Sequence, residues 1–339
     1  MNEIQAQQLF HQHLTAPADC VTAARDLCGF QAQFFSNALH SLKIRSGMVD
    51  DVFVRRAFVK SWTLRGTMHL FPLDDLPLFF YCGRENHLRP CDTLDADEWI
   101  TRERKRYFAD CILEAVEAGT GEREALKILC RKQGMTPEEE RSIFNSWGGT
   151  LRALCENGKL CYLASEEKAF RLCPPFEPMN EEEAWHELLM RYFSNYGPAA
   201  VKDAAYFFGT SVTQIKRRME KMPLVHFVHE GREYWTAEPQ SDTPQPPQCI
   251  FLAGFDPLLM GYEKTESLYL PREYLRRIFL LSGIVMPALL LDGRIAGKWK
   301  KNGKGLKITL FESVYESDRK VILSSAEELW NDIARIEFE

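Results

Sequence analysis

The sequence contains no long apolar run and no paired-cysteine motif. No window of its 339 residues approaches the unbroken apolar length of a membrane span, and the first residues, MNEIQAQQLFHQHL, lack the basic and then apolar pattern of a secretory signal. The ten cysteines are scattered without a C-x-x-C pair. We therefore expect a cytoplasmic protein with reduced cysteines, no membrane partner, no metal site and no cofactor.

An excess of basic charge is also absent. The 42 Lys and Arg residues are outnumbered by 48 Asp and Glu residues, which gives a formal net charge of −6. This balance argues mildly against a protein that coats nucleic acid nonspecifically, although it does not exclude a basic groove. Three local basic clusters occur, and for each one a solvated surface is the simplest interpretation: Arg102, Arg104, Lys105 and Arg106; Lys216, Arg217 and Arg218; Lys298, Lys300, Lys301 and Lys304.

The remaining composition is that of an ordinary folded protein, with 45% hydrophobic and 27% charged residues. The length exceeds what one typical hydrophobic core supports, so two to four domains are expected. Apolar residues at helical spacing predict helices over residues 2–14, 19–30 and 33–46, the second of them capped by Asp19. SWTLRGTMHLF then predicts a hairpin that turns at Arg65-Gly66.

Helices followed by a short hairpin are the order of a winged helix, and this order returns twice. The second segment predicts helices and then strands in GKLCYLA and KAFRLC. The third segment is the clearest. It places Pro198 in a first helical turn, Ser211 as the N-cap of a recognition-like helix, and a hairpin around Gly231.

The last part of the chain has a different character. EPQSDTPQPPQ reads as a Pro-rich linker, and the pattern after it is mainly strand. Asp292-Gly293 and Asn302-Gly303 lie between apolar runs and predict two hairpins. The tail SAEELWNDIARIEFE is predicted to be a closing helix.

The sequence matches two common catalytic motifs only in part. HELLM at His186 lacks the second His of a zinc protease helix, and GKWKKNGKG from Gly297 has five residues between its glycines and no Ser or Thr after the Lys. The sequence contains no nucleophile elbow, dinucleotide fingerprint or deaminase Cys/His set.

Five motifs together are recognisable: FQAQFFSNALHSLKIR, KSWTLRGTMHLF, YGPAAVKDAAYFFG, GFDPLLMGY and LLLDGRIAGKWK. In kind and order they resemble the winged-helix DNA-binding superfamily that includes the AlkZ-like DNA glycosylases, over nearly the full chain. The resemblance implies an α+β fold of three tandem winged-helix units followed by a C-terminal β-barrel. It divides the chain into a first winged helix with the catalytic motif (1–98), a second (99–178), a third (179–240), a Pro-rich linker (241–248) and a barrel with a closing helix (249–339).

The resemblance also implies an activity in DNA repair. It predicts a monofunctional DNA glycosylase that hydrolyses the N-glycosidic bond of cationic N7-alkylpurines, including bulky adducts and interstrand crosslinks. Its partner would be double-stranded DNA carrying alkylated purines, and we expect it to act as a monomer. The catalytic motif of the family is Gln-apolar-Gln, or Gln-apolar-Asp in the YcaQ-like branch, and Gln31-Ala32-Gln33 matches the first form.

The two glutamines also have a plain structural interpretation, as amides that satisfy backbone groups at a helix end. Without the resemblance we would favour it, because the triplet is frequent by chance and occurs again at Gln5 to Gln7, where we assign no role. Residues two apart point to different faces of a helix but to the same side of an extended or turn segment. The spacing of Gln31 and Gln33 therefore predicts an irregular junction.

Further site residues follow from the resemblance. In the predicted hairpin, Trp62, Arg65, Thr67 and His69 are candidates for binding DNA or lining the catalytic channel. Their structural alternative is a place in the turn or, for Trp62, in the core of the first domain, and for Trp62 the structural role is favoured. DNA contacts are also predicted from the third unit, at Lys216, Arg217 and Arg218. In GFDPLLMGY we expect Asp256 to be an N-cap rather than a group facing the channel. The residues that follow, Glu263-Lys264-Thr265, depart from the family, whose members commonly have a basic pair there.

Two functions of other classes stay open on the sequence. A winged helix mostly binds DNA without chemistry, so a non-catalytic DNA-binding protein or transcription regulator is the main alternative. A protein-interaction scaffold is the other, because net acidity suits it.

Overall fold

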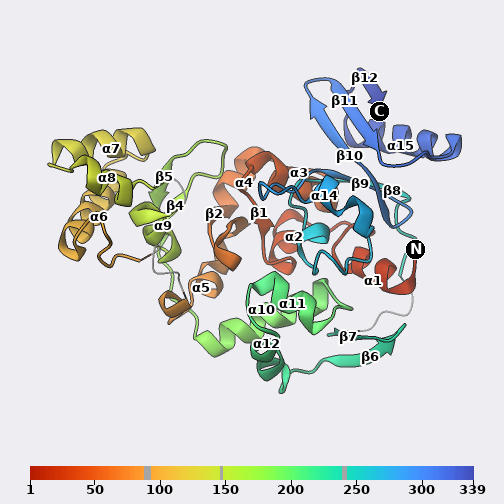
Figure 1. Ribbon diagram of the computed structural model, residues 1–339, viewed down its shortest axis with the longest axis horizontal. Coiled ribbons are helices and arrows are strands. Elements are labelled where there is room, and N and C mark those ends of the chain that lie inside the picture. Colours follow the sequence, from red (N-terminus) through yellow and green to blue (C-terminus); the bar gives the residue numbers. More distant parts are fainter. Residues whose placement is uncertain (88–92, 146–147, 239–242) are drawn as a thin grey trace. The chain divides into compact units, whose positions relative to one another are not determined.

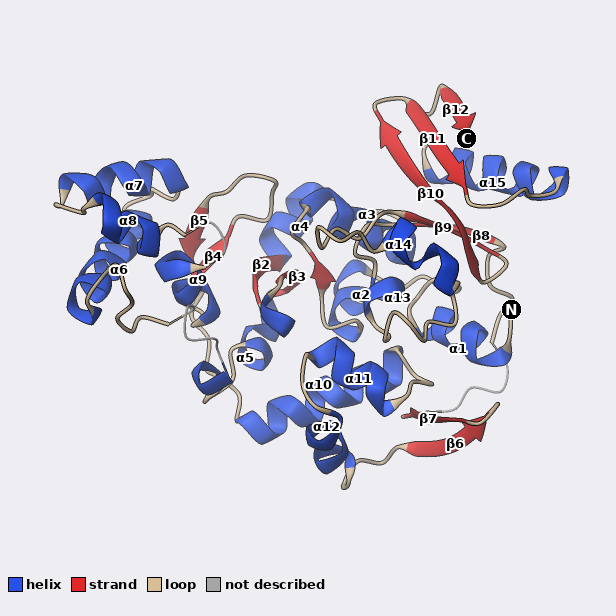
Figure 2. Ribbon diagram, viewed as in Figure 1, coloured by secondary structure: helices blue, strands red, loops and turns tan. Residues whose placement is uncertain are grey.

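The structure is a computed structural model that describes residues 1–87, 93–145, 148–238 and 243–339 (Figures 1 and 2). The chain forms two compact units. The discontinuous unit comprises residues Met1–Val49 and Leu188–Glu339, and the inserted unit comprises residues Asp50–Glu187. Both contain helices and strands, so the fold is of mixed α and β type. None of the helices among the described residues has the length and apolar character needed to cross a lipid bilayer.

The discontinuous unit begins with helices that have side-chain caps. Its first elements are α1 (Glu3–His11), α2 (Cys20–Asp26), β1 (Phe30–Gln31) and α3 (Phe35–Ser46). The Asp19 carboxylate accepts hydrogen bonds from the N–H groups of Val21 and Thr22, which confirms the predicted cap of α2.

The chain returns to this unit within α10 (Glu181–Asn195) and continues with two short helices and a hairpin: α11 (Val201–Phe208), α12 (Val212–Met219), β6 (Val225–His229) and β7 (Arg232–Thr236). The Ser211 hydroxyl accepts from the Gln214 N–H and caps α12, as predicted. The hairpin around Gly231 is also confirmed, since β6 and β7 pair antiparallel with His229 opposite Arg232.

The prediction for Pro198 was wrong. Helix α11 begins at Val201, so Pro198 lies two residues before the N-cap Ala200 rather than in the first turn. The helix begins later because the Asp203 carboxylate reaches back to accept from the Ala200 N–H over 3.0 Å, which stabilises that start.

The C-terminal part of this unit is a sheet packed on a helix. Its elements are β8 (Cys249–Leu252), α13 (Pro257–Met260), α14 (Leu275–Ile278), β9 (Ala288–Leu291), β10 (Arg294–Asn302), β11 (Gly305–Leu310), α15 (Glu316–Leu329) and β12 (Arg335–Phe338). Helix α15 lies beside this sheet (Figure 2). Trp299, Leu306 and Ile308 of the sheet form one core with Ile322 and Ala326 of α15.

Both predicted hairpins of this sheet are confirmed. Asp292 and Gly293 have left-handed φ values of +48° and +78° between β9 and β10, and Asn302 pairs with Gly305 at the turn from β10 to β11. The strand order is β12-β11-β10-β9-β8, and among the described residues no pairing joins β8 to β12. The β-barrel stays a prediction.

The predicted closing helix needs a correction. Helix α15 ends at Leu329, and the last residues form β12, which pairs parallel with β11. Ile336 and Phe338 alternate with polar residues and pack against the same core as α15, so the extended form buries apolar surface there. Residues 241–242 of the predicted linker lie outside the described residues.

The inserted unit contains six helices and two hairpins among its described residues: α4 (Asp51–Ala57), β2 (Phe58–Trp62), β3 (Met68–Pro72), α5 (Leu76–Phe79), α6 (Arg102–Glu117), α7 (Arg123–Lys132), α8 (Pro137–Ile143), α9 (Gly149–Glu156), β4 (Leu160–Tyr162) and β5 (Phe170–Leu172). Both predicted hairpins are confirmed, and they join through the pairing of Lys60 with Tyr162. Helices α6 to α9 surround a core that includes Phe108, Leu126 and Leu154.

The first basic cluster is not uniformly solvated, contrary to expectation. Lys105 is 1% exposed, and its ammonium group donates to the Asp95 carbonyl and to the Asp97 carboxylate. Arg104 forms two hydrogen bonds with Glu139. Lys105 is therefore buried with an acidic partner, whereas Arg104 pairs with Glu139 while its side chain stays 39% exposed.

Candidate active site

The Gln-Ala-Gln motif lies at the junction between a strand and a helix. Gln31 ends β1, and Gln33 lies in the bend before Phe35, where α3 begins. Nε2 of Gln31 donates a hydrogen bond to Oε1 of Gln33 over 3.0 Å. The two amides therefore point toward each other, which confirms the irregular junction predicted from their spacing.

The two amides differ in exposure. Gln31 is 7% exposed and Ala32 is fully buried, whereas Gln33 is exposed. An amide oxygen has two lone pairs, so Oε1 of Gln33 can accept a second hydrogen bond while Gln31 holds it in place. The pair thus presents a fixed, neutral acceptor to an incoming molecule.

The earlier copy of the triplet has the structural role. The Gln5 side chain is buried and donates to the carbonyl groups of Leu268 and Gly293 at 2.9 and 2.8 Å. It satisfies backbone acceptors of the discontinuous unit, as a buried amide must. Identical tripeptides therefore differ in which groups their side chains contact.

A buried ion pair anchors the helix that follows the motif. Arg45 of α3 and Asp256 are both 0% exposed and form two hydrogen bonds, at 2.7 and 2.9 Å. Asp256 also accepts from the Ser41 hydroxyl and caps α13 through the Leu258 N–H. The cap is confirmed, and the same carboxylate binds α3 to the GFDPLLMGY segment.

The rest of that segment packs at the start of α3. Phe255 has a left-handed φ of +60°, and its ring stacks on Phe34 with centroids 6.1 Å apart. A Cβ at Gly254 would lie 2.7 Å from Nδ2 of Asn37 in α3 and 2.8 Å from the Val285 carbonyl oxygen, so a larger residue would displace the backbone at Val285. The GFDPLLMGY segment thus packs against the junction between β1 and α3 and supports it.

The hairpin residues Trp62, Arg65, Thr67 and His69 all belong to the inserted unit. Trp62 is half-buried and packs against the core formed by α6 to α9, rather than within the first 98 residues as predicted. Arg65 has a left-handed φ of +55° in the turn, and the Thr67 hydroxyl donates to the Leu64 carbonyl. These contacts give Trp62 and Thr67 structural roles in the hairpin.

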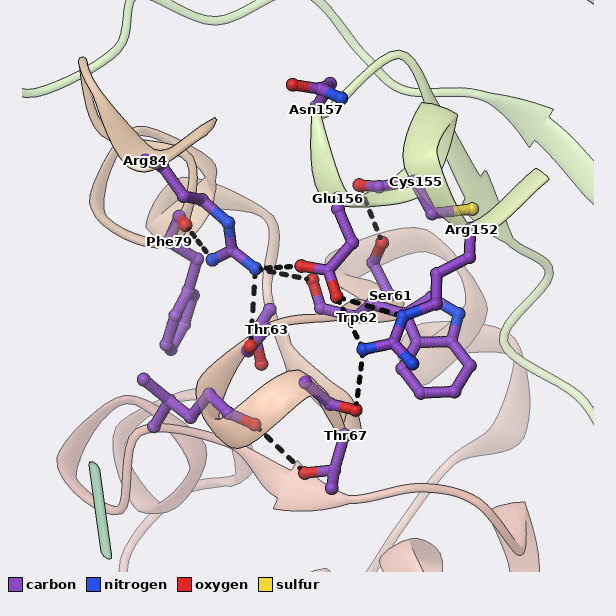
Figure 3. Close-up of polar contacts among 12 residues, drawn as sticks. Ser61, Trp62, Thr63, Thr67, Phe79, Arg84, Arg152, Cys155, Glu156 and Asn157 are labelled. Atoms are coloured by element: carbon purple, nitrogen blue, oxygen red, sulfur yellow. Dashed lines mark hydrogen bonds and ion pairs between the residues drawn. The ribbon is translucent and has the colours of Figure 1, made fainter. Parts of the chain in front are cut away.

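Two arginines and one glutamate hold this turn in place (Figure 3). Glu156 is 2% exposed and pairs with Arg84 at 2.5 Å and with Arg152 at 3.0 Å. Arg84 also donates to the carbonyls of Trp62 and Thr63. Arg152 donates to the Gly66 carbonyl, and its guanidinium lies 4.1 Å from the centre of the Trp62 ring. The sequence offers no signal for this cluster, because charged residues on short helices are usually exposed.

His69 is buried beside Thr63. Its Nδ1 lies 2.9 Å from the Thr63 hydroxyl and 3.1 Å from the Thr67 carbonyl. Burial, with a smaller contribution from the Arg65 charge, lowers the pKa of His69 to about 3. His69 is therefore neutral at pH 7 and does not supply a positive charge to DNA.

We expect acid to destabilise the protein through His69 and His40. Burial lowers the pKa of His40 to about 4, and its ring donates to the Phe251 carbonyl. Both folded pKa values lie below the usual value near 6.5, so the unfolded chain binds protons first and this stabilisation, complete above pH 6.5, is lost as the pH falls. Between pH 7.5 and 5.5 each histidine should lower the free energy of unfolding by about 1 kcal/mol.

Urea unfolding at the two pH values measures this loss. In His69→Asn, which keeps a donor near the Thr67 carbonyl, the loss should be smaller by about 1 kcal/mol. A variant whose loss equals that of the wild type would rule out a buried neutral histidine at this position.

The predicted basic residues of α12 are accessible. Lys216 and Arg217 are exposed, Arg218 is half-buried, and Ile215 turns inward to the core. One face of this helix therefore carries Gln214 and two cations toward solvent. Among the described residues, no group of three or more His, Cys, Asp or Glu side chains is placed to hold a metal ion.

Comparisons with known proteins agree with this picture. Residues 24–331 match the family described as DNA glycosylase AlkZ-like. The interstrand DNA cross-link repair glycosylase of Streptomyces sahachiroi is 25% identical over 336 residues, covering 90% of this chain and 88% of that protein. The solved structure of S. sahachiroi DNA glycosylase AlkZ has the same fold, with a TM-score of 0.79, 21% identity, and coverage of 99% of this chain and 97% of that one.

The fold is a mixed α and β fold similar to that of a solved DNA glycosylase. The match over most of the chain is decisive for the family. This chain belongs to the AlkZ-like DNA glycosylase family.

Proposed function

We propose that this protein is a monofunctional DNA glycosylase that hydrolyses the N-glycosidic bond of cationic N7-alkylpurines, including bulky adducts and interstrand crosslinks. The observation that carries the proposal is the hydrogen-bonded pair of Gln31 and Gln33, one buried and one exposed, at a rigid junction. Family membership and the name of the S. sahachiroi relative support it.

The chemistry explains why neutral amides suffice. Alkylation at N7 makes the purine cationic, so it leaves as a neutral base and needs no acid to protonate it. The remaining demand is to stabilise an oxocarbenium-like sugar and to aim a water molecule at C1′. The Gln33 oxygen presents the negative end of its dipole to that cation and accepts a hydrogen bond from the attacking water, while Gln31 fixes its orientation.

The second part of the proposal concerns how the protein binds DNA. We propose that the three tandem winged-helix units (1–98, 99–178 and 179–240), the linker (241–248) and the β-barrel (249–339) form a frame that binds the damaged duplex as a monomer. In it, Lys216 and Arg217 contact phosphate, and so does Arg65 at the tip of the β2–β3 hairpin. The exposure of the two α12 cations supports this role.

The test is base release from defined duplexes. A duplex with a single 7-methylguanine, and a second duplex with an N7-linked interstrand crosslink, are incubated with excess protein and cleaved with alkali. We expect release from both, and release of uracil from a matched duplex slower by about 100-fold or more, because a neutral leaving group needs the acid catalysis that this site lacks. Comparable release of uracil would contradict the mechanism, and release from neither alkylated duplex would contradict the function.

One observation favours a second candidate, a DNA-binding regulator without catalysis. Helix α12 is capped by Ser211 and exposes Gln214, Lys216 and Arg217, as a recognition helix would. A regulator would bind one intact sequence in preference to others, with a strong salt dependence, and Gln33→Ala would leave that binding unchanged.

A further inference from the structure

An exposed phenylalanine stands directly beside Gln33. Phe34 is 44% exposed, whereas its neighbours Phe30 and Phe35 are 0% and 5% exposed. Gln33 and Phe34 are both exposed and their Cα atoms are about 3.8 Å apart, so one large ligand can contact both residues. A large apolar side chain next to a polar site calls for a functional explanation more than a scattered surface residue does.

Phe34 stands at the N-terminal end of helix α3. It is the N-cap residue of α3, and α3 has no side-chain cap hydrogen bond. Among the described residues, seven other helices have capping residues with such bonds, namely Asn2, Asp19, Asp50, Thr101, Thr136, Ser211 and Asp256, whereas α5, α7, α9, α11, α14 and α15 also lack one. Phe34 therefore has no capping role in α3, and its exposed ring is free to contact another molecule.

One face of the ring is already covered. Phe255, itself 5% exposed, stacks on Phe34 with an angle of 27° between the rings. Phe255 has a left-handed φ, a costly conformation for a bulky residue, and Asp256 beside it is held by the buried ion pair with Arg45. The support beneath Phe34 is rigid, and the remaining exposure offers a flat aromatic surface.

The chemistry of that surface points to a nucleobase. Unpaired bases stack on aromatic side chains, and a purine alkylated at N7 is also a cation, which the negative face of a phenyl ring attracts. We propose that Phe34 is a specificity-determining residue that stacks on the cationic purine whose glycosidic bond lies at Gln33. This inference rests on the proposed glycosylase function, and it adds a base-binding surface to the amide pair.

The test separates binding of the base from cleavage. Fluorescence anisotropy compares an unmodified duplex with a duplex carrying 2′-fluorinated 7-methylguanosine, in which the fluorine slows glycosidic cleavage. Phe34→Ala and Phe34→Leu should each weaken binding to the adduct duplex about 5- to 150-fold and leave binding to the unmodified duplex unchanged. Phe34→Trp should retain or tighten binding to the adduct.

Two controls isolate the aromatic face. Phe53→Ala removes a phenylalanine of nearly equal exposure, 45%, from the inserted unit and should leave adduct binding unchanged. Phe34→Asn introduces a preferred N-cap residue, so it should fold normally and still lose adduct binding. Thermal unfolding of each variant shows that the fold is intact.

Three results would overturn the inference: wild-type binding by Phe34→Leu, an equal loss on unmodified DNA, or no preference of the wild type for the adduct. Failure of the proposed function would look different, because it would be an absence of base release from cleavable adducts in the separate alkaline assay. If binding of the adduct depended on the Phe34 ring but no base were released, the stacking inference would stand and the proposed hydrolysis would be contradicted.

Discussion

Replacing Gln33 by alanine is expected to lower the single-turnover rate of 7-methylguanine release by about 100- to 1,000-fold, the cost of removing one preorganised polar group at a developing charge. The Gln33 side chain is exposed and its oxygen accepts from Nε2 of Gln31 at 3.0 Å, so in the proposed mechanism its loss removes the acceptor for water and the dipole that stabilises the sugar cation. Gln31→Ala should cost less than Gln33→Ala, because it frees the Gln33 amide without removing it.

Two variants make this result specific. Gln7→Ala alters the last residue of the other Gln-Ala-Gln triplet and should leave the rate unchanged. Gln33→Asp reproduces the Gln-apolar-Asp motif of the YcaQ-like branch and should retain much of the activity, since a carboxylate is also an acceptor. If Gln33→Ala released the base as fast as the wild type, the amide pair would have no part in the chemistry.

Replacing Asp256 by alanine is expected to lower the free energy of unfolding by about 3–5 kcal/mol, the cost of leaving one partner of a buried ion pair uncompensated. The Arg45 guanidinium is 0% exposed and makes bonds to the Asp256 carboxylate at 2.7 and 2.9 Å. Its other bonds go to the carbonyl groups of Gln12 and Ser41, which do not neutralise the charge. Helix α3 should loosen, and with it the junction that holds Gln33.

Urea unfolding measures this effect, and a surface ion pair supplies the matched control. Glu312 lies 3.3 Å from Arg294 and both side chains are more than 40% exposed, so Glu312→Ala should cost less than about 1 kcal/mol. The double variant Arg45→Met with Asp256→Leu should recover much of the lost stability, because no unpaired charge remains. Equal effects of Asp256→Ala and Glu312→Ala would contradict the structural role assigned to the pair.

Local signals predicted several elements correctly. The caps at Asp19 and Ser211 and the hairpin at Asp292-Gly293 each depend on one residue and its immediate neighbours. The β2–β3 turn at Arg65-Gly66 was also predicted from local residues, although Arg84 and Arg152 hold it from more distant positions. Pro198 and the tail were predicted wrongly, the first because a local cap was overlooked and the second because a more distant strand decided the conformation. The Asp203 carboxylate moved the start of α11, and pairing with β11 drew the last residues out of helix.

The sequence by itself determined the mixed α and β composition and the family, and the resemblance to that family selected the candidate amides Gln31 and Gln33. Only the tertiary structure decided which residues support them. Arg45 and Asp256 are 211 positions apart, and Phe34 meets Phe255 from the same separate segments. The reason is physical: caps and turns are set by bonds within a few residues, whereas a buried charge or a stacked ring finds its partner through packing that no local pattern records.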